Sequence, residues 1–381
     1  MHILIAPDKF KGSLAADTVA RIVADELKAR IPAAKTKILP IADGGEGTAS
    51  ILTEALGGRW VPCTVSNALG REVEAGYGLI ASEDETIAVL EMSSASGLAM
   101  IPEHERDPWS SSTLGTGQLM TAAMDAGADK IIVGLGGSAT NDGGSGMARA
   151  LGFQFLDATG APVDDLPSSL DAVTEIVYSL ERDLPEIVAA CDVDNPLLGE
   201  RGAIAVFGPQ KGVTDEEVGR FENRLRHLAD LVACDLGTDP RDVPGAGAAG
   251  GLGFGLLAFA EARLESGFDL VAGILGIEDA IRSADIVITG EGKLDEQTLM
   301  GKGPGGIARM AKEAGKPVIG FCGRAGAVDQ LATLFDAVFP VSEATLPVEE
   351  SMARAGELLK IAVAKAADRI QEWDSRTHET T

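Results

Sequence analysis

The glycine-rich segment at residues 130–146 is the part of the chain whose residue types point most clearly to chemistry. It reads K-I-I-V-G-L-G-G-S-A-T-N-D-G-G-S-G. Glycines let backbone N–H groups close around an anion, and the helix expected after the loop would add its positive dipole end. A glycine-rich turn can also be purely structural. The polar residues Ser138, Thr140, Asn141 and Asp142 within it favour a ligand loop for a phosphate or a carboxylate.

Four other polar segments also follow apolar runs typical of buried strands. They are A-P-D-K-F-K-G-S (6–13), P-I-A-D-G-G-E-G-T (40–48), C-D-V-D-N-P (191–196) and T-G-E-G-K-L-D-E-Q-T (289–298). Each one alone suits an ordinary turn, because Asp and Gly favour turns. In open parallel sheets, however, ligands bind beyond the carboxyl ends of the strands. Together the segments therefore predict a shared binding site.

The predicted site is rich in carboxylates, more than an anion site needs. Its acids are Asp8, Asp43, Glu46, Asp192, Asp194, Glu291 and Asp295. A cation resolves this conflict, since Mg²⁺ is usually held by one or two carboxylates together with substrate phosphates. Lys9, Lys11 and Lys293 are available to neutralise the remaining charge. These groups suit phosphoryl transfer, in which catalysis is mainly positioning and charge stabilisation.

Composition excludes several classes of protein. The 381 residues include 32 basic and 58 acidic side chains, a net charge of −26, which opposes the phosphate neutralisation that nucleic-acid binding needs. No segment approaches the roughly 18 apolar residues of a membrane helix. The four cysteines are scattered and the four histidines do not cluster, so we expect a reducing, cytoplasmic compartment and no zinc site. We expect small-molecule partners, with no nucleic acid and no membrane.

Apolar runs alternating with helical patterns predict an α/β fold with mainly parallel sheets. At this length two domains are expected. We predict a doubly wound parallel sheet, flavodoxin- or Rossmann-like, from residues 1–60 and 280–375, a second α/β domain inserted at 61–279, and a frayed tail at 376–381. The runs expected as strands are 3–6, 36–39, 87–91, 131–133, 187–191, 286–289, 318–322 and 337–341.

These motifs, in this order, resemble the glycerate kinases of the bacterial glycerate 2-kinase family, the first of two unrelated classes. The resemblance spans about residues 1–373 and rests on segments 6–14, 42–48, 134–144, 191–199, 207–212, 244–255 and 289–298. It implies ATP-dependent phosphorylation of D-glycerate, with the 2-hydroxyl as the expected acceptor, giving 2-phosphoglycerate. It also implies two α/β domains with the active site in the cleft between them. Lys9 stands where many members carry serine.

The chemistry of such a reaction suggests a role for each candidate residue. We expect Asp192, with Asp194 as second choice, to orient and deprotonate the glycerate hydroxyl, and Lys11 and Lys293 to stabilise the transition state. The residues expected to hold the nucleotide are Gly136, Gly137, Ser138, Asn141, Gly290 and Glu291. Those expected near the substrate are Asp8, Lys9, Asp43, Gly44, Gly45 and Glu46. The expected Mg²⁺ ligands are Asp43, Asp192 and Asp295.

Some questions stay open at this point. A kinase of another small hydroxy acid is an alternative, and so is a nucleotide- or metabolite-sensing module without chemistry. The many carboxylates favour an enzyme, because an anion sensor has no use for them. Gln210 and Lys211 either contact substrate or shape a turn. The P-G-A-G-A-A-G-G-L-G-F-G segment (244–255) suits a close-packed junction of two backbones. The sequence does not decide between a monomer and a homodimer.

Overall fold

The computed structural model describes residues 1–82, 84–178, 183–294, 298, 303–325, 331–342 and 346–379. The chain folds into two compact units, one formed by Met1–Asp43 with Val271–Thr381 and the other by Gly44–Leu270. Helix α2 (Thr48–Ala55) packs against strands β3, β4 and β5 of the second unit. The structural division therefore falls near residues 43 and 270, where the sequence analysis had placed it near 60 and 280.

The first unit is built on a parallel sheet whose described strands run in the order β13–β12–β11–β1–β2. The strands are β1 (His2–Ile5), β2 (Lys35–Ile38), β11 (Ile286–Leu294), β12 (Val318–Ala325) and β13 (Ala337–Pro340). Strand β1 pairs with β2 on one side and with β11 on the other. The chain thus winds outward in both directions from β1, which confirms the predicted doubly wound sheet. In such sheets ligands bind where the winding reverses, here between β1 and β11.

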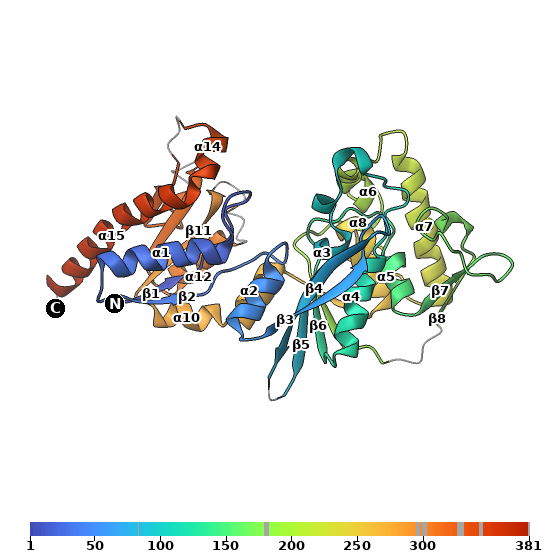
Figure 1. The fold of residues 1–381 in the computed structure, drawn as a ribbon, viewed down its shortest axis with the longest axis horizontal. Helices are drawn as coiled ribbons and strands as arrows, with labels where there is room; N and C mark the ends of the chain where they lie inside the picture. Colours follow the sequence, from blue (N-terminus) through green and yellow to red (C-terminus); the bar gives the residue numbers. More distant parts are fainter. Residues whose placement is uncertain are drawn as a thin grey trace. The chain divides into compact units, whose positions relative to one another are not determined.

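Helices cover both faces of this sheet (Figure 1). Ile3 and Ile5 pack with helices α1 and α15, whereas Leu4 lies between them in sequence and faces the opposite side, where α10 and α12 pack. The helices are α1 (Ala16–Arg30), α9 (Gly267–Ile274), α10 (Ile277–Ser283), α12 (Pro304–Glu313), α14 (Val348–Ala353) and α15 (Ala355–Glu379). Helix α15 thus runs through most of the segment expected to fray.

The second unit contains a mixed sheet, in the order β10–β9–β6–β5–β4–β3 among the described strands. Strands β10, β9, β6 and β5 are parallel, and β4 and β3 are antiparallel. The strands are β3 (Arg59–Ser66), β4 (Glu72–Ala81), β5 (Thr86–Glu91), β6 (Lys130–Gly134), β9 (Glu186–Ala190) and β10 (Arg263–Glu265). A separate antiparallel pair is formed by β7 (Phe153–Leu156) and β8 (Glu175–Tyr178).

Helices complete the second unit around its own apolar core. Besides α2 they are α3 (Ser93–Ser96), α4 (Leu114–Asp125), α5 (Ser145–Ala150), α6 (Ala203–Phe207), α7 (Val218–Asp235) and α8 (Ala248–Phe259). Short 3-10 turns are η1 (Leu98–Met100), η2 (Glu103–Glu105), η3 (Leu170–Ala172) and η4 (Pro209–Lys211). A search of the described helices finds none that combines the length and the apolar character needed to cross a membrane.

Helix α8 begins with a kink that brings two glycine-rich segments into backbone contact. Residues Ala249, Gly250 and Gly251 have positive φ angles of 54°, 69° and 88°. A Cβ added at Gly250 would lie 1.8 Å from the carbonyl oxygen of Thr140, and Gly143 N donates to Gly250 O at 3.2 Å. The structure confirms the close-packed junction expected at 244–255, and its partner is the glycine loop at 134–146.

This packing predicts that Gly250→Ala lowers the free energy of unfolding by at least about 2 kcal/mol, because the new Cβ would overlap the Thr140 carbonyl at a strained φ angle. Gly219→Ala is the matched control. Gly219 is exposed in α7 with nothing near its Cβ position, so alanine should raise the stability by up to about 1 kcal/mol. Denaturant unfolding measures both variants. Equal stability of Gly250→Ala and the wild type would contradict the packing described.

Candidate functional site

Three neighbouring parallel strands of the second unit end together. In the register of β5, β6 and β9, Glu91 pairs with Gly134 and Gly134 pairs with Ala190. The glycine loop leaves β6 after Gly134, and the turn containing Asp192 leaves β9 after Ala190. These two segments, predicted to serve one site, therefore start from paired residues at the same edge of one sheet.

The Gly44–Thr48 turn packs directly onto this edge. Gly44, with φ +80°, leaves only 2.7 Å between its Cβ position and the Cβ of Ala190. A Cβ on Gly134 would lie 2.4 Å from Gly44 O, and one on Gly136 would lie 3.0 Å from the Cα of Gly45. Glycine is therefore required on both sides of the contact. The structure brings the predicted Gly44 and Gly45 against the glycine loop, while Glu46 is exposed.

Glu91 fixes this turn and was not predicted as a site residue. Its Oε1 accepts hydrogen bonds from Gly47 N at 3.0 Å and from Ala49 N at 2.8 Å, which caps the start of α2. The available signal was its position as an acid at the end of the apolar run 87–91. Glu91 thus ties the end of β5 to the turn on the edge of β6 and β9.

Three side chains of the glycine-loop region have buried polar atoms without a hydrogen-bond partner among the described residues. Asn141 is 4% exposed, and neither its Oδ1 nor its Nδ2 has a hydrogen-bond partner among the described residues. The hydroxyls of Thr140 and Ser145 are also buried without a hydrogen-bond partner among the described residues. Leaving such groups unsatisfied is unfavourable, so native structures rarely keep them without a role. The predicted Ser138 is also buried beside them, whereas Gly137 is exposed.

The side chain of Asp142 holds the glycine loop in place through hydrogen bonds. Its carboxylate accepts hydrogen bonds from the N and Oγ1 of Thr113 and from the N–H groups of Gly144 and Gly146. Burial raises the pKa of this carboxyl, and the same hydrogen bonds oppose the rise. N–H groups at the start of α5 are therefore used by Asp142. This corrects the expectation that the start of this helix presents its donors to an anion.

Lys211 lies buried behind the same loop. It is 2% exposed, and its Nζ donates to the carbonyl oxygen of Thr140 at 2.7 Å. Burial lowers the pKa of its ammonium to about 7, and the negative charge of Asp142 opposes this shift. Gln210, the other residue left open in the sequence, is exposed. Lys211 therefore contacts the loop, and its sequence position four residues after an apolar run gave no hint of burial.

The two acids of the C-D-V-D-N-P turn differ in environment. Asp192 is half-buried, and its Oδ1 accepts from Ser266 Oγ at 3.4 Å and from Gly267 N at 3.2 Å. Asp194 is exposed and forms an ion pair at 2.9 Å with the exposed Arg201. A surface pair of this kind contributes little energy. The geometry therefore favours Asp192 over Asp194 as the residue that orients a substrate.

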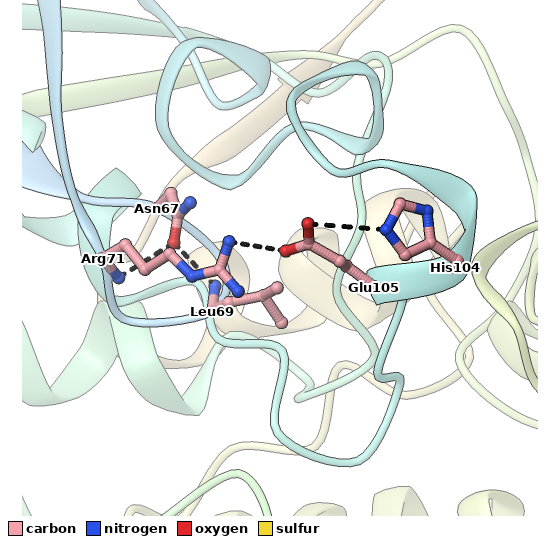
Figure 2. A network of polar contacts seen from close by, with 5 residues as sticks. All are labelled: Asn67, Leu69, Arg71, His104 and Glu105. Carbon is pink, nitrogen blue, oxygen red and sulfur yellow. Dashed lines mark hydrogen bonds and ion pairs between the residues drawn. The ribbon is translucent and has the colours of Figure 1, made fainter.

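A second layer supports the glycine loop from outside. Ala139 of the loop packs in a small apolar cluster with Ala68, which belongs to the turn between β3 and β4. Figure 2 shows how this turn is held: Asn67 Oδ1 accepts from the backbone N of Arg71 at 3.0 Å, and Arg71 Nη1 donates to Glu105 Oε2 at 2.6 Å. The network positions the surface on which the loop rests.

The first unit carries its own group of predicted residues at the reversal between β1 and β11. Asp8 is 8% exposed, accepts from Lys9 N at 2.6 Å through Oδ1, and donates its own N–H to Gly290 O at 2.8 Å. Burial, helped by the negative charge of Asp43, raises the pKa of the Asp8 carboxyl to about 6, while Lys9 opposes the rise. Asp8 and Asp43 therefore form an acidic pair at the expected ligand-binding position of this sheet.

The segment following the predicted strand 286–289 is a strand as well. Strand β11 continues to Leu294, and β12 pairs with Gly290 through Phe321 and with Lys293 through Arg324. Gly290 and Glu291, expected to hold the nucleotide, therefore lie within a strand, because β12 offers backbone partners along this length. Glu291 Oε1 accepts from Thr298 Oγ1 at 2.8 Å. Lys293 and Lys11 are exposed, and Asp295 lies outside the described residues.

Comparison with known proteins gives the class and then the family. A doubly wound parallel sheet with strand-end acids, joined in one chain to a second α/β unit with a glycine loop, defines a two-unit α/β protein. Residues 3–371 match the model of the Glycerate kinase family. The chain belongs to the glycerate kinase family.

Individual relatives cover nearly the whole chain. It is 43% identical to the glycerate kinase of Bacillus subtilis (strain 168) over 378 residues, which is 97% of this chain and 98% of that protein. It is 43% identical to the glycerate 2-kinase of Escherichia coli (strain K12) over 348 residues, which is 90% of each. A crystal structure from Salmonella typhimurium LT2, of a candidate glycerate kinase 2, matches with a TM-score of 0.86 and 42% identity, covering 98% of this chain and 99% of that one.

The raised pKa of Asp8 predicts a stability signature. Because the folded state holds this proton more tightly than the unfolded state, stability present below about pH 4 is lost as the pH rises through about 6. Asp8→Asn removes that loss, so the variant should be more stable than the wild type by about 3 kcal/mol at pH 7 and by less than about 1 kcal/mol at pH 4. Denaturant unfolding at both pH values measures this difference. Asp25→Asn, at an exposed position of α1, serves as control; an Asp8→Asn gain no larger than the control's would contradict the burial of this charge.

Proposed function

We propose that this protein is an ATP-dependent kinase that phosphorylates D-glycerate at its 2-hydroxyl, with Mg²⁺, to give 2-phosphoglycerate. Membership of the glycerate kinase family supports the reaction class. The observation that carries the proposal is the edge where β6 and β9 end side by side, with the buried Asn141 amide on one segment and Asp192 on the next. A phosphate-binding loop beside an oriented carboxylate is what phosphoryl transfer to an alcohol requires.

In this mechanism the glycine loop receives the nucleotide phosphates through Gly136, Gly137, Ser138 and Asn141. Asp192, held by its contacts with Ser266 and Gly267, accepts the proton of the substrate hydroxyl. Lys11 and Lys293 are exposed cations suited to stabilising charge as the phosphoryl group transfers. Gly290 and Glu291, within β11, are proposed to complete the nucleotide site from their strand.

The carboxylate of glycerate needs a cation or a cluster of N–H groups. We assign it to the region of Asp8, Lys9 and the Asp43–Glu46 turn. Lys9 is half-buried next to Asp8 and is the cation of this region. The Gly44 turn lies against Ala190 at the edge of the second sheet, and we assign it to the same carboxylate site.

Oxygen ligands for Mg²⁺ are present in the first unit. The Asp43 charge acts on the buried carboxyl of Asp8, and such a pair is relieved by a divalent cation. Asp43 would hold the ion, with Asp192 and Asp295 as the other proposed ligands. Among the described residues no three acids, histidines or cysteines gather into a metal site. When bound, Mg²⁺ would neutralise phosphate charge, with phosphates and water as further ligands.

We also propose that the protein works in the cytoplasm. All four cysteines, Cys63, Cys191, Cys234 and Cys322, are free thiols. Free thiols suit a reducing compartment, where disulfides rarely persist. The acidic composition, with a net charge of −26, suits small-molecule partners.

A direct test measures ADP release from ATP and Mg²⁺ with a panel of small hydroxy acids. D-glycerate should stimulate ADP formation well above the background with ATP alone, and phosphorus NMR of the product should show 2-phosphoglycerate. Stimulation by a different hydroxy acid would reassign the substrate. No stimulation by any acid, combined with ligand-induced thermal stabilisation, would identify a binding module without chemistry.

The contrast between Asp192 and Asp194 predicts unequal effects of two matched substitutions. Asp192→Asn should lower turnover at least about 10²-fold, because assistance to proton removal is lost. Asp194→Asn breaks an exposed ion pair with Arg201 and should change turnover less than about threefold. Turnover at saturating ATP and D-glycerate, with thermal unfolding as a check of the fold, measures both. The reverse ranking would reject Asp192 as the proton acceptor.

A further inference from the structure

Lys211 is a buried cation whose position the reaction scheme above does not explain. Its side chain is 2% exposed, and the hydrogen bond to Thr140 O is 2.7 Å long. An ammonium has three donors, and burying it is unfavourable unless its charge is compensated. A lysine that only had to hold one backbone carbonyl could be replaced by a neutral donor without this penalty.

The second observation lies one peptide further along the chain. Asn141, which follows the carbonyl held by Lys211, keeps both polar atoms of its amide buried and without a partner among the described residues. The hydroxyl of Thr140 is unsatisfied too. A buried lysine behind the unsatisfied donors Asn141 Nδ2 and Thr140 Oγ1 is suited to an oxyanion, because the anion accepts from the donors and stabilises the protonated ammonium.

The charged surroundings of Lys211 are few. Asp142, on the glycine loop, is the charged group that acts on its ammonium. Arg106 donates through Nη1 to the carbonyl of the neighbouring Gln210 at 3.2 Å. Helix α6 and the 244–251 segment, which pack beside η4, contain no ionisable side chain. Asp142 adds a carboxyl group close to the loop, and its four donors are not available to a ligand. An incoming anion therefore requires a positive charge on this side of the loop.

We propose that Lys211 is a positioning residue that holds the Thr140–Asn141 peptide and supplies the buried positive charge for an oxyanion bound at this turn. The oxyanion is either a nucleotide phosphate or the carboxylate of the hydroxy acid. This inference rests on the proposed function of the glycine loop. Because the lowered pKa of Lys211 leaves it mostly neutral at about pH 8, binding of the anion must draw a proton onto its Nζ.

The test is calorimetric titration of the full-length protein at about pH 8 with Mg-ADP and, separately, with D-glycerate. Running each titration in HEPES and in Tris, which differ in ionisation enthalpy, gives the number of protons taken up. The wild type should take up close to one proton with one of the two ligands. Lys211→Met should show no uptake with that ligand and bind it at least about tenfold more weakly.

Two other variants separate charge from structure. Lys211→Gln keeps a donor but no charge, so it should also lose the proton uptake even where its affinity is less affected; it replaces the methionine variant if that one does not fold. Lys130→Met removes a lysine at the opposite end of β6, where it pairs with Glu186 at 3.2 Å, and should keep both affinity and uptake.

The ligand that Lys211→Met binds more weakly identifies the oxyanion. Weaker binding of Mg-ADP indicates a nucleotide phosphate, and weaker binding of D-glycerate indicates its carboxylate. Wild-type proton uptake in both Lys211 variants, or binding of both ligands within about twofold of the wild type, would overturn the inference. ADP release by the wild type with D-glycerate is measured in parallel. If that activity is absent while Lys211→Met still loses ligand affinity, the proposed function fails and the inference on Lys211 stands.

Discussion

Backbone contact between glycines is the constraint on which the second unit depends. Gly134 and Gly136 lie against Gly44 and Gly45, and the kink at Gly250 places its Cβ position 1.8 Å from Thr140 O. A side chain at Gly44, Gly134 or Gly250 would overlap its neighbours. Three segments far apart in sequence can therefore meet at one sheet edge only because each approaches as bare backbone. Under the proposed function, the same absence of side chains lets backbone N–H groups approach an anion.

Buried polar groups give this frame its chemistry. The carboxylates of Asp142 and Glu91 accept hydrogen bonds from backbone N–H groups. These bonds fix the glycine loop and the neighbouring Gly44–Thr48 turn. Lys211 donates to the carbonyl oxygen of Thr140, the residue before Asn141, whose side-chain amide has no partner among the described residues. In the first unit, Asp8 is buried beside the charge of Asp43 at the reversal of the sheet. Each unit therefore has buried polar groups at its strand ends. A charged ligand that interacts with these groups would lower the free-energy cost of burying them.

Much of this arrangement was predictable from sequence. Buried parallel strands are continuous apolar runs, so β1, β6 and β9 were readily recognised, and the polar residues that follow them mark the edge where we propose that ligands bind. Strands β3 and β4 were not predicted. β3 reads R-W-V-P-C-T-V-S and buries only Val65 fully, and such half-exposed antiparallel strands lack a continuous apolar signal. The extension of β11 to Leu294 depends on its pairing with β12, which its own sequence does not encode.

The candidate site shows the same division. Residue types and strand ends pointed to Asp8, Asn141 and Asp192, because local sequence reports what a loop can offer. The roles of Asp142 and Lys211 depend on partners 29 and 71 residues away in the chain, Thr113 and Thr140. Burial of a lysine is a property of the assembled fold, and no local pattern signals it.

The central claim is that the glycine loop binds the phosphates of a nucleotide. Hydrogen exchange followed by mass spectrometry, with and without Mg-ADP, tests it most directly. The account predicts that Mg-ADP slows amide exchange in peptides covering residues 134–146 and leaves the β7–β8 strand pair unchanged. Unchanged exchange in 134–146 under saturating Mg-ADP, with protection confined to other segments, would contradict it.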